Sequence, residues 1–279
     1  MIRTVLMLGF WTALLPIAAL LGFPWTLITG NVSFLYRMGM WGSWTGIRVA
    51  GIKVNTIGLE KLDPARTYVF MSNHVSNIDP PLLLPLIPRR TSVMAKKELF
   101  EYPLLGKMMR LGSLVPVDRG NRESGIGAVR AASHVIRSGV NMTIFVEGKR
   151  SFDGRLLPFK KGPFYLAEEC GVPVVPVTIV GTHAIMPKRR FAIRPGIATV
   201  IFHDPIEPRD FSGRECLMMK VRKAIDSGLA PELQENQVAA KDIGEQERKI
   251  EVSRSTGGDN LMQDFEAKMS LPILGVRLD

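Results

Sequence analysis

The sequence predicts an α/β fold in which a sheet is covered by helices, preceded by an N-terminal hydrophobic membrane-anchoring segment. From about residue 46 onward, short β-branched runs alternate with helical stretches, a pattern typical of such folds. Hydrophobic residues make up 46% of the chain, and the mean hydropathy of +0.11 is high for a fully soluble enzyme. The 279 residues suffice for one α/β domain with attachments, and hardly for two complete domains.

The N-terminal segment has the composition of a membrane anchor. No charged residue lies between Arg3 and Arg37, and Val5–Ile28 is long enough to cross a hydrocarbon core of ~30 Å. Pro16 and Pro24 allow a second geometry, in which two shorter helices dip into one leaflet. Aromatic side chains that favour the membrane–water interface flank the segment: Trp11, Trp25, Tyr36, Trp41 and Trp44. We expect this segment to attach the protein to a membrane. The sequence allows both a segment that crosses the bilayer and one that inserts into a single leaflet.

A signal peptide is the alternative interpretation of this segment. The single arginine before the apolar stretch fits it, but no small-x-small cleavage site stands out between Gly30 and Tyr36. We therefore divide the chain into an anchor (1–40), a catalytic domain (41–231) and a polar acidic C-terminal tail (232–279).

Seven strands and five helices are expected in the domain. The strands are Ile47–Ile57, Tyr68–Ser72, Ser92–Ala95, Leu114–Val117, Met142–Val146, Pro173–Val180 and Ala198–Phe202. The helices are Pro80–Ile87, Leu104–Leu111, Glu123–Ser138, Pro163–Glu169 and Arg214–Ser227.

Charge is unevenly distributed along the chain. The net charge is +10, yet residues 232–268 contain nine acids against five bases, so the preceding part is more basic still. Such a field attracts nucleic acid, acidic headgroups or phosphorylated substrates. No zinc-finger spacing or aromatic-interleaved basic stripe is present, and the apolar N-terminus favours lipid, so we expect no nucleic-acid partner. The two cysteines, Cys170 and Cys216, suggest no disulfide framework and favour a reducing compartment.

The segment Ser72–Pro81 is the first candidate for chemistry. An apolar strand ends at Met71, a polar loop carrying His74 follows, and Asp79-Pro80 resembles an N-cap with proline at the first helical position. A carboxylate beside an imidazole fixes its tautomer and stabilises the imidazolium, as activation of an alcohol requires. On spacing alone, a helix cap beside an ordinary loop histidine is an equal alternative. The absence of a G-x-S-x-G elbow, a phosphate-binding P-loop and an H-E-x-x-H motif favours the functional interpretation.

Two further strand ends carry basic turns. After the strand ending at Val146 the chain continues Glu147-Gly148-Lys149-Arg150, and after Val117 it continues Asp118-Arg119. Ligands bind at strand ends in open α/β sheets, and a guanidinium holds a phosphate with two hydrogen bonds. The alternative is that these are solvent-exposed basic turns with no role in binding. A carboxylate such as that of Glu147 at the end of an apolar strand needs a partner, and we expect an arginine.

In this order, the segments resemble the glycerolipid acyltransferase family, closest to the 1-acylglycerol-3-phosphate acyltransferases. The His-x-x-x-x-Asp signature stands at His74 and Asp79. The second block resembles Lys96-Lys97-Glu98-Leu99 through the Asp118-Arg119 end. The third, usually Glu-Gly-Thr-Arg-Ser, stands as residues 147–151 with Lys149 in place of threonine, and the proline-rich fourth resembles residues 172–177. The likeness covers about residues 45–206, and the tail beyond Pro231 matches no block.

The resemblance implies a glycerol-3-phosphate acyltransferase-like fold and transfer of a fatty acyl group to the sn-2 hydroxyl of 1-acylglycerol 3-phosphate. It implies His74 as base and Asp79 as its orienting partner. It implies substrate binding by Lys97, Arg119, Glu147, Gly148, Lys149 and Arg150. The donor would be acyl-CoA or acyl-carrier protein, with no cofactor, no metal and no covalent acyl-enzyme. Another lysophospholipid, glycerol 3-phosphate or a lyso-aminolipid stays open as acceptor. The expected location is a bacterial inner membrane, with the domain on the cytoplasmic face.

Overall fold

A computed structural model describes residues 1–118 and 120–235. The predicted site residue Arg119 and nearly all of the predicted C-terminal tail therefore lie outside the described residues. Residues 1–233 form one compact unit.

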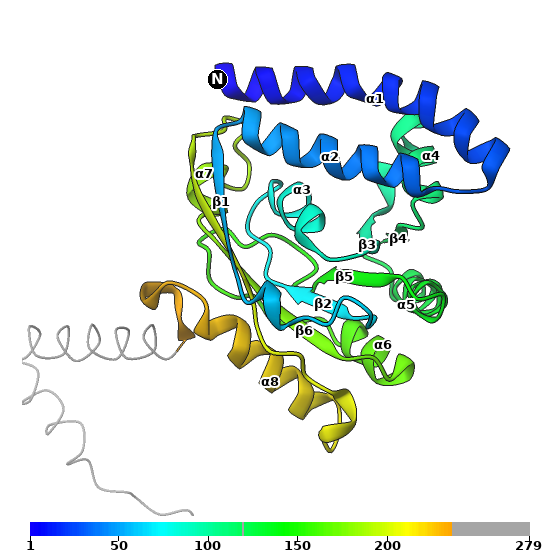
Figure 1. The fold of residues 1–279 in the computed structure, drawn as a ribbon. Helices are drawn as coiled ribbons and strands as arrows, with labels where there is room; N and C mark the ends of the chain where they lie inside the picture. Colours follow the sequence, from blue (N-terminus) through cyan, green and yellow to red (C-terminus); the bar gives the residue numbers. More distant parts are fainter. Residues whose placement is uncertain (119, 236–279) are drawn as a thin grey trace, which may run out of the picture. The chain divides into compact units, whose positions relative to one another are not determined.

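A mixed seven-stranded sheet forms the centre of this unit (Figure 1), in the order β1-β7-β6-β2-β5-β3-β4. Strands β2 to β6 are mutually parallel, whereas β7 pairs antiparallel with β6, and β1 pairs parallel with β7. All seven predicted strands are confirmed: β1 Ile52–Ile57, β2 Val69–Ser72, β3 Thr91–Lys96, β4 Val115–Val117, β5 Asn141–Phe145, β6 Val174–Val180 and β7 Gly196–Phe202.

The five predicted helices are also confirmed, with small differences at their ends. They are α3 Asp79–Leu83 continued by a 3-10 turn Leu84–Leu86, α4 Pro103–Leu111, α5 Arg122–Arg137, α6 Gly162–Cys170 and α8 Arg214–Ser227. The predicted apolar segment Val5–Ile28 forms one continuous helix, α1 Ile2–Thr29, which contains both Pro16 and Pro24. Two helices were not assigned from sequence: α2 Ser33–Val49 and the short α7 Thr182–Ile185. The start predicted for the first strand is wrong, because Ile47–Val49 end α2 and the strand begins only at Ile52.

The two faces of the sheet carry separate cores. In β2, Phe70 packs toward α1, α2 and α3, whereas Val69 and Met71 pack toward α5, α6 and α8. Successive side chains of a strand point to opposite faces, and both faces here are covered. All four residues of β2 are buried, as expected for a central strand in a largely parallel sheet.

Helices α1 and α2 pack against each other over much of their length and lie over α3 and α4 (Figure 1). Close approach depends on glycine: a Cβ atom at Gly46 would lie 2.2 Å from Nε1 of Trp11. Trp11 Nε1 donates a hydrogen bond to the carbonyl of Gly42 at 3.0 Å. The expected boundary at residue 40 falls inside α2, and α2 contacts β1 and α3, so the anchor and the domain share one packed structure.

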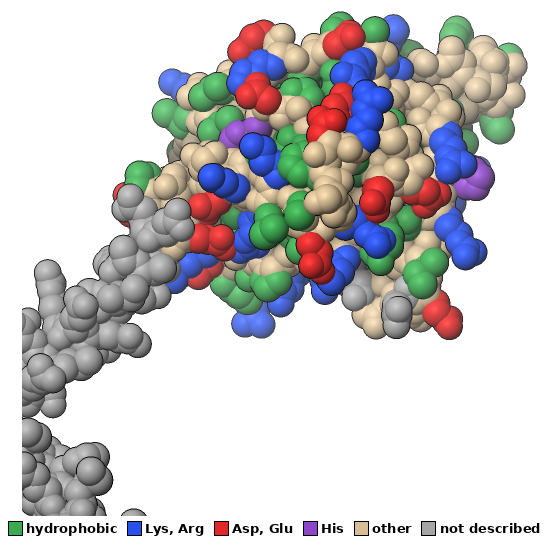
Figure 2. All heavy atoms as spheres, turned by 90° about the horizontal axis from the view of Figure 1, so that it is seen from below, with side chains coloured by type: hydrophobic (Ala, Val, Ile, Leu, Met, Phe, Trp, Pro, Cys, Tyr) green, Lys and Arg blue, Asp and Glu red, His purple; other side chains and the backbone are tan. Residues whose placement is uncertain are grey.

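The face opposite α1 has a different surface. Seen from below in Figure 2, Lys, Arg, Asp and Glu side chains alternate, and apolar side chains are scattered between them. Exposed large apolar side chains instead concentrate on α1, among them Val5, Leu20, Leu21, Leu27 and Ile28. Among the described residues α1 is the one helix long and apolar enough to cross a membrane.

Candidate active site

The predicted site segments converge at one edge of the sheet. Strands β2, β3, β4 and β5 are parallel, so their carboxyl ends, which lead to His74, Lys97, Asp118 and Glu147, meet there. Strand-end placement was predicted for the segments of His74, Asp118 and Glu147, and the topology confirms it. Ligands of open α/β sheets bind at this edge.

His74 and Asp79 form a buried pair. Nδ1 of His74 lies 2.7 Å from Oδ2 of Asp79, and the same oxygen accepts from the amides of Val75 at 2.7 Å and Ser76 at 2.8 Å. Asp79 is completely buried and His74 is 7% exposed. The other carboxylate oxygen, Oδ1, has no hydrogen-bond partner among the residues described. Three bonds on one oxygen therefore hold the carboxylate against the ring.

The N-cap assignment of Asp79 is wrong by one residue. Ile78 is the N-cap, α3 begins at Asp79, and no side chain caps the helix. Because the Asp79 carboxylate turns back to the loop amides and the imidazole, the alternative in which it merely caps the helix fails. The arrangement leaves Nε2 of His74 as the ring nitrogen for a ligand.

Two polar residues that were not singled out hold this loop in place. The amide of Asn73 accepts from the backbone N–H of Ile179 at 2.8 Å and donates to its carbonyl at 3.0 Å, so the side chain extends the β2–β6 ladder. The hydroxyl of Ser76 donates to the carbonyl of Met186 at 2.8 Å. Both are fully buried. The sequence signal for them was weak, because Asn and Ser in a loop usually face water.

Glu147 is the second buried carboxylate of the site. Oε1 accepts from the backbone N–H of His74 at 2.9 Å, and Oε2 accepts from that of Leu157 at 3.0 Å. Both of these hydrogen bonds come from backbone amides, and an arginine, Arg222, acts on the carboxylate through its charge. Desolvation raises the pKa of Glu147 to about 7, although the two amide bonds and, more weakly, the charge of Arg222 oppose the shift.

The Glu147–Ser151 turn bends sharply back over His74. Gly148 has φ of +68°, a conformation in which a Cβ is strained, and its N–H donates to the carbonyl of Phe145 at 3.0 Å. The amide of Ser151 donates to the carbonyl of His74 at 2.8 Å. Lys149 is exposed and Arg150 half-buried. The β2 and β5 strand ends are thus tied together directly, and Arg150 lines the same cavity as His74.

The second predicted block is positioned differently. Lys97, in the 3-10 segment Lys97–Glu101, forms an ion pair with Asp118 after β4, and this pair is partly exposed to solvent. The charge of Lys97 is therefore shared with a carboxylate, unlike the charges of Lys149 and Arg150. Where Arg119 places its guanidinium lies outside the described residues.

A large apolar cavity opens beside His74. Its volume is about 840 Å³, and it runs between α1 and α2 on one side and β3, α3 and α4 on the other. The ring of Phe145, which lines it, stacks on His74 at 4.3 Å between centroids. The only histidine, lysine and arginine in the described lining are His74, Lys96 and Arg150, and no carboxylate lines it. The cavity can hold a long apolar group with a polar or anionic end near His74.

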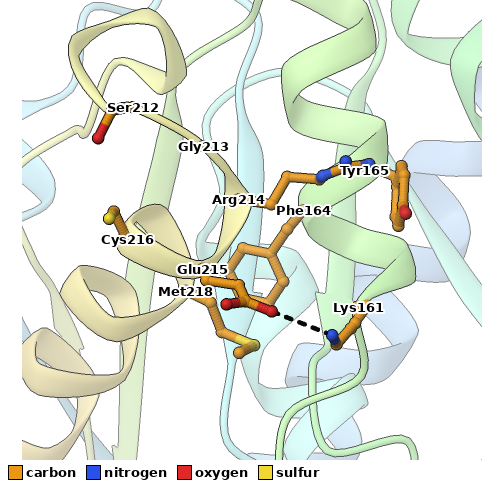
Figure 3. Close-up of a pocket in the computed structure, with 9 residues that line it drawn as sticks. All are labelled: Lys161, Phe164, Tyr165, Ser212, Gly213, Arg214, Glu215, Cys216 and Met218. Atoms are coloured by element: carbon orange, nitrogen blue, oxygen red, sulfur yellow. Dashed lines mark hydrogen bonds and ion pairs between the residues drawn. The ribbon is translucent and has the colours of Figure 1, made fainter.

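A second hollow of about 430 Å³ lies between α6 and the start of α8 (Figure 3). Its charged side chains have partners: Lys161 Nζ lies 3.2 Å from Glu215 Oε1, and the guanidinium of Arg214 lies 3.7 Å from the centroid of the Tyr165 ring. Cys216 lines this hollow and Cys170 lies on α6, where its thiol donates to Ser133 at 3.4 Å. Neither cysteine lines the larger cavity beside His74.

Comparison with known proteins agrees with this architecture. The model of the acyltransferase family matches residues 53–180. The 1-acyl-sn-glycerol-3-phosphate acyltransferase of Cocos nucifera is 36% identical over 174 residues, which are 62% of this chain and 56% of the relative. That of Limnanthes douglasii is 36% identical over 190 residues, which are 68% of this chain and 66% of the relative. The matches span between about half and two thirds of the curated relatives' length.

A solved structure extends the likeness to the fold. The crystal structure of the 1-acyl-sn-glycerophosphate (LPA) acyltransferase PlsC from Thermotoga maritima superposes with a TM-score of 0.72 at 26% identity, covering 81% of this chain and 93% of that one. Strand order, ordered sequence blocks and sequence likeness point the same way. The chain therefore belongs to the acyltransferase family.

Proposed function

We propose that the chain transfers a fatty acyl group from an acyl thioester to the sn-2 hydroxyl of 1-acylglycerol 3-phosphate, which makes phosphatidic acid. One observation carries the proposal. His74, whose imidazole contacts the buried carboxylate of Asp79, lines an apolar cavity whose described lining contains cations and no carboxylate. A lipid that carries a hydroxyl near a phosphate is complementary to these features. The names of the relatives and of the structural neighbour support the same acceptor.

The proposed chemistry needs one base. Nε2 of His74 takes the proton of the acceptor hydroxyl as its oxygen attacks the thioester carbonyl. The tetrahedral intermediate then collapses, the carbon–sulfur bond breaks, and the imidazolium returns the proton to the departing thiolate. Asp79 fixes the tautomer with Nδ1 protonated and stabilises the imidazolium. A thioester is already an activated acyl donor, so base catalysis worth roughly 10²–10⁴-fold and positioning suffice without a metal or cofactor.

The acceptor phosphate binds, in this proposal, to Arg150 and Lys149, with Arg119 and Lys97 contributing from the neighbouring strand ends. Gly148 provides the turn that brings Arg150 beside the cavity. Arg150 lines the cavity itself, and a guanidinium grips a phosphate through two parallel hydrogen bonds. Glu147 holds the loop of His74 instead of the substrate, because both of its oxygens are occupied by backbone amides.

The N-terminal helices bring the site to its lipid. Along α1 the buried residues run from Thr4 to Thr26, so one side of the helix is covered by protein over nearly its whole length. A helix packed in this way fits a one-leaflet position better than a lone span. We propose that the apolar outer side of α1 enters one leaflet of a bacterial inner membrane, with the domain on the cytoplasmic side, and that the chain has no nucleic-acid partner.

The donor is acyl-CoA or acyl-carrier protein. Both present the same thioester, so a matrix of the two donors against several acceptors separates them. The alternative acceptors are another lysophospholipid, glycerol 3-phosphate and a lyso-aminolipid. The cations around the cavity predict that monoacylglycerol, which lacks the phosphate, is a poor acceptor.

The test uses purified protein in detergent with 1-acylglycerol 3-phosphate and acyl-CoA, followed by thiol release. We expect His74→Ala to lower kcat by at least ~10³-fold. His134→Ala, an exposed histidine on α5, is the matched control and keeps full activity. Activity of His74→Ala near the wild-type rate would refute the mechanism, and equal rates with and without the acceptor phosphate would refute the role of Arg150.

A further inference from the structure

The loop from Pro187 to Arg194, between α7 and β7, carries charge that no acid balances. Four of its eight residues are cationic: Lys188, Arg189, Arg190 and Arg194. No acidic residue occurs in the sequence between Glu169 and Asp204. Among the described residues, none of these four cations has a carboxylate within ion-pairing distance.

The neighbouring cations add to this field. The pKa of Lys188 is lowered, first by desolvation and then by the positive charges of Arg150, Lys149 and Arg189. Lys188 and Arg189 both lie over the ring of Phe152, at 3.8 and 5.2 Å from its centroid. Like charges crowd together here, which is unfavourable unless an anion binds.

The loop lies beside the N-terminal end of the apolar helix α1. The backbone N–H of Ile193 donates to the hydroxyl of Thr4 at 2.8 Å, and Ile193 and Met7 share one core. Phe191, two residues earlier, is 77% exposed, and Ile2 on α1 is equally exposed. An exposed phenylalanine next to arginines, beside an apolar helix, is typical of a segment at a membrane interface.

The backbone of Arg189 is strained. The turn is closed by a hydrogen bond from Arg190 N–H to the carbonyl of Pro187 at 3.1 Å, and Arg189 has φ of +67°. Glycine or asparagine is the favoured residue at such a position. The presence of arginine in this unfavourable conformation indicates that its side chain has a function.

We propose that the loop from Pro187 to Arg194 is a binding site for the phosphate groups of anionic phospholipids at the membrane surface. Arg189 and Arg190 bind lipid phosphates, and Phe191 enters the outer part of the acyl-chain region beside α1. The site adds selectivity for anionic lipid to the apolar attachment of α1. It also lies close to the substrate site, because Lys188 Nζ donates to the carbonyl of Arg150 at 2.7 Å.

Vesicle flotation of the full chain tests this inference, because its readout does not depend on acyltransferase activity. Wild-type protein and the double variant Arg189→Gly, Arg190→Gln are compared on vesicles of phosphatidylcholine alone and with one third phosphatidylglycerol. Each lost contact should weaken binding to anionic vesicles roughly 5-fold, and binding to neutral vesicles should stay unchanged. Phe191→Ser should weaken binding to both kinds of vesicle.

The matched control is Lys220→Gln, Lys223→Gln on α8, which removes the same charge from exposed positions on the opposite face. It should float like wild type. Arg189→Gly relieves the backbone strain, so the double variant should melt no lower than wild type and keep its activity in detergent. Equal losses for both double variants would mean that net charge alone acts and would overturn the proposal. Unchanged flotation with a raised KM for acyl-CoA would also overturn it and assign the loop to the donor.

Discussion

The two hollows of the molecule differ in what their charged groups do. In the hollow between α6 and α8, Lys161 pairs with Glu215, and Arg214 lies 3.4 Å from Glu168 and over Tyr165 (Figure 3). These charges satisfy one another and stay half-exposed or exposed. In the cavity beneath α1 and α2, Lys96 pairs with Glu98 outside the lining, whereas Arg150 has no carboxylate within ion-pairing distance among the described residues. The nearby acids Asp79 and Glu147 are buried, and their oxygens accept from backbone amides and, for Asp79, contact His74.

The contrast shows how a candidate site is recognised. Ion pairs exposed to solvent contribute little and leave nothing for a ligand. A buried carboxylate held against an imidazole costs free energy to desolvate and is retained where it has a task. The cavity beside His74 is recognised as the candidate site less by its larger volume than by the unbalanced charge of its lining.

The largest expected effect is at Asp79. Asp79→Asn preserves the shape of the side chain but removes the charge that stabilises the imidazolium, and it can hold the wrong tautomer. We expect kcat to fall by about 10³–10⁴-fold with KM nearly unchanged, measured by thiol release in detergent.

Glu215→Gln in the second hollow is the control for Asp79→Asn. It breaks the ion pair with Lys161 and should leave both kcat and KM at wild-type values. A comparable loss of kcat in Asp79→Asn and Glu215→Gln would mean that the difference between the two hollows does not matter for catalysis.

Glu147→Gln should have the next largest effect. Both carboxylate oxygens of Glu147 accept from backbone N–H groups. A glutamine has only one carbonyl oxygen, so its NH₂ group would face one of these N–H donors. The His74 loop should shift, and a misplacement of about 1 Å can cost on the order of 10²-fold in kcat. A variant that raises only KM would instead indicate direct substrate binding by Glu147 and contradict its assignment as a positioning residue.

The comparison also shows what the sequence could and could not predict. Short β-branched runs between helical stretches located all seven strands, and strand-end placement located His74, Lys149 and Arg150. An arginine was expected beside Glu147, and the charge of Arg222 does act on it. The backbone amides that hold its oxygens could not be predicted, because an amide 10 residues away leaves no trace in side-chain chemistry. The N-cap was misplaced for a similar reason: the Asp79 carboxylate satisfies the loop before it, and local spacing cannot distinguish the two directions.

The N-terminal helices were harder still. Continuous apolar composition predicts attachment, but the packing of α1 on α2 depends on glycines such as Gly46 that face a partner 35 residues away in the chain. The two-helix arrangement and the cavity beneath it are tertiary features. Sequence periodicity contains no information on which face of an all-apolar helix is covered by protein.

Filling the cavity should change acyl-chain preference. Ala95 lines it and is half-buried. Ala95→Phe should shorten the longest acyl chain accepted, and each methylene lost from the pocket changes kcat/KM about 10-fold. The measurement is a series of acyl donors of increasing length. Ser212→Phe, in the second hollow, is the matched control and should keep the wild-type preference. If both variants show the same acyl-chain preference, the acyl chain does not bind in this cavity.

The smallest effect expected concerns stability and pH. The pKa of Glu147 is about 7 in the folded protein, against 4.5 for an ordinary glutamate, mainly through desolvation. Between these pH values the folded protein holds a proton that the unfolded chain has released. The free energy of unfolding should therefore fall as pH rises from about 4.5 to about 7, by at most about 1.4 kcal/mol per pH unit from this group.

Denaturant unfolding in detergent at pH 5, 6, 7 and 8 measures this slope. Glu147→Gln cannot titrate, so its slope between pH 5 and pH 7 should be flatter than that of wild type. Glu215→Gln removes an exposed and paired carboxylate and controls for the loss of an acid as such. If both variants change the slope equally, the burial that separates the carboxylates of the two hollows has no energetic consequence. If only Glu147→Gln flattens it, the backbone amides of His74 and Leu157 hold a carboxylate whose charge is costly, which is the physical difference between a site and a surface hollow.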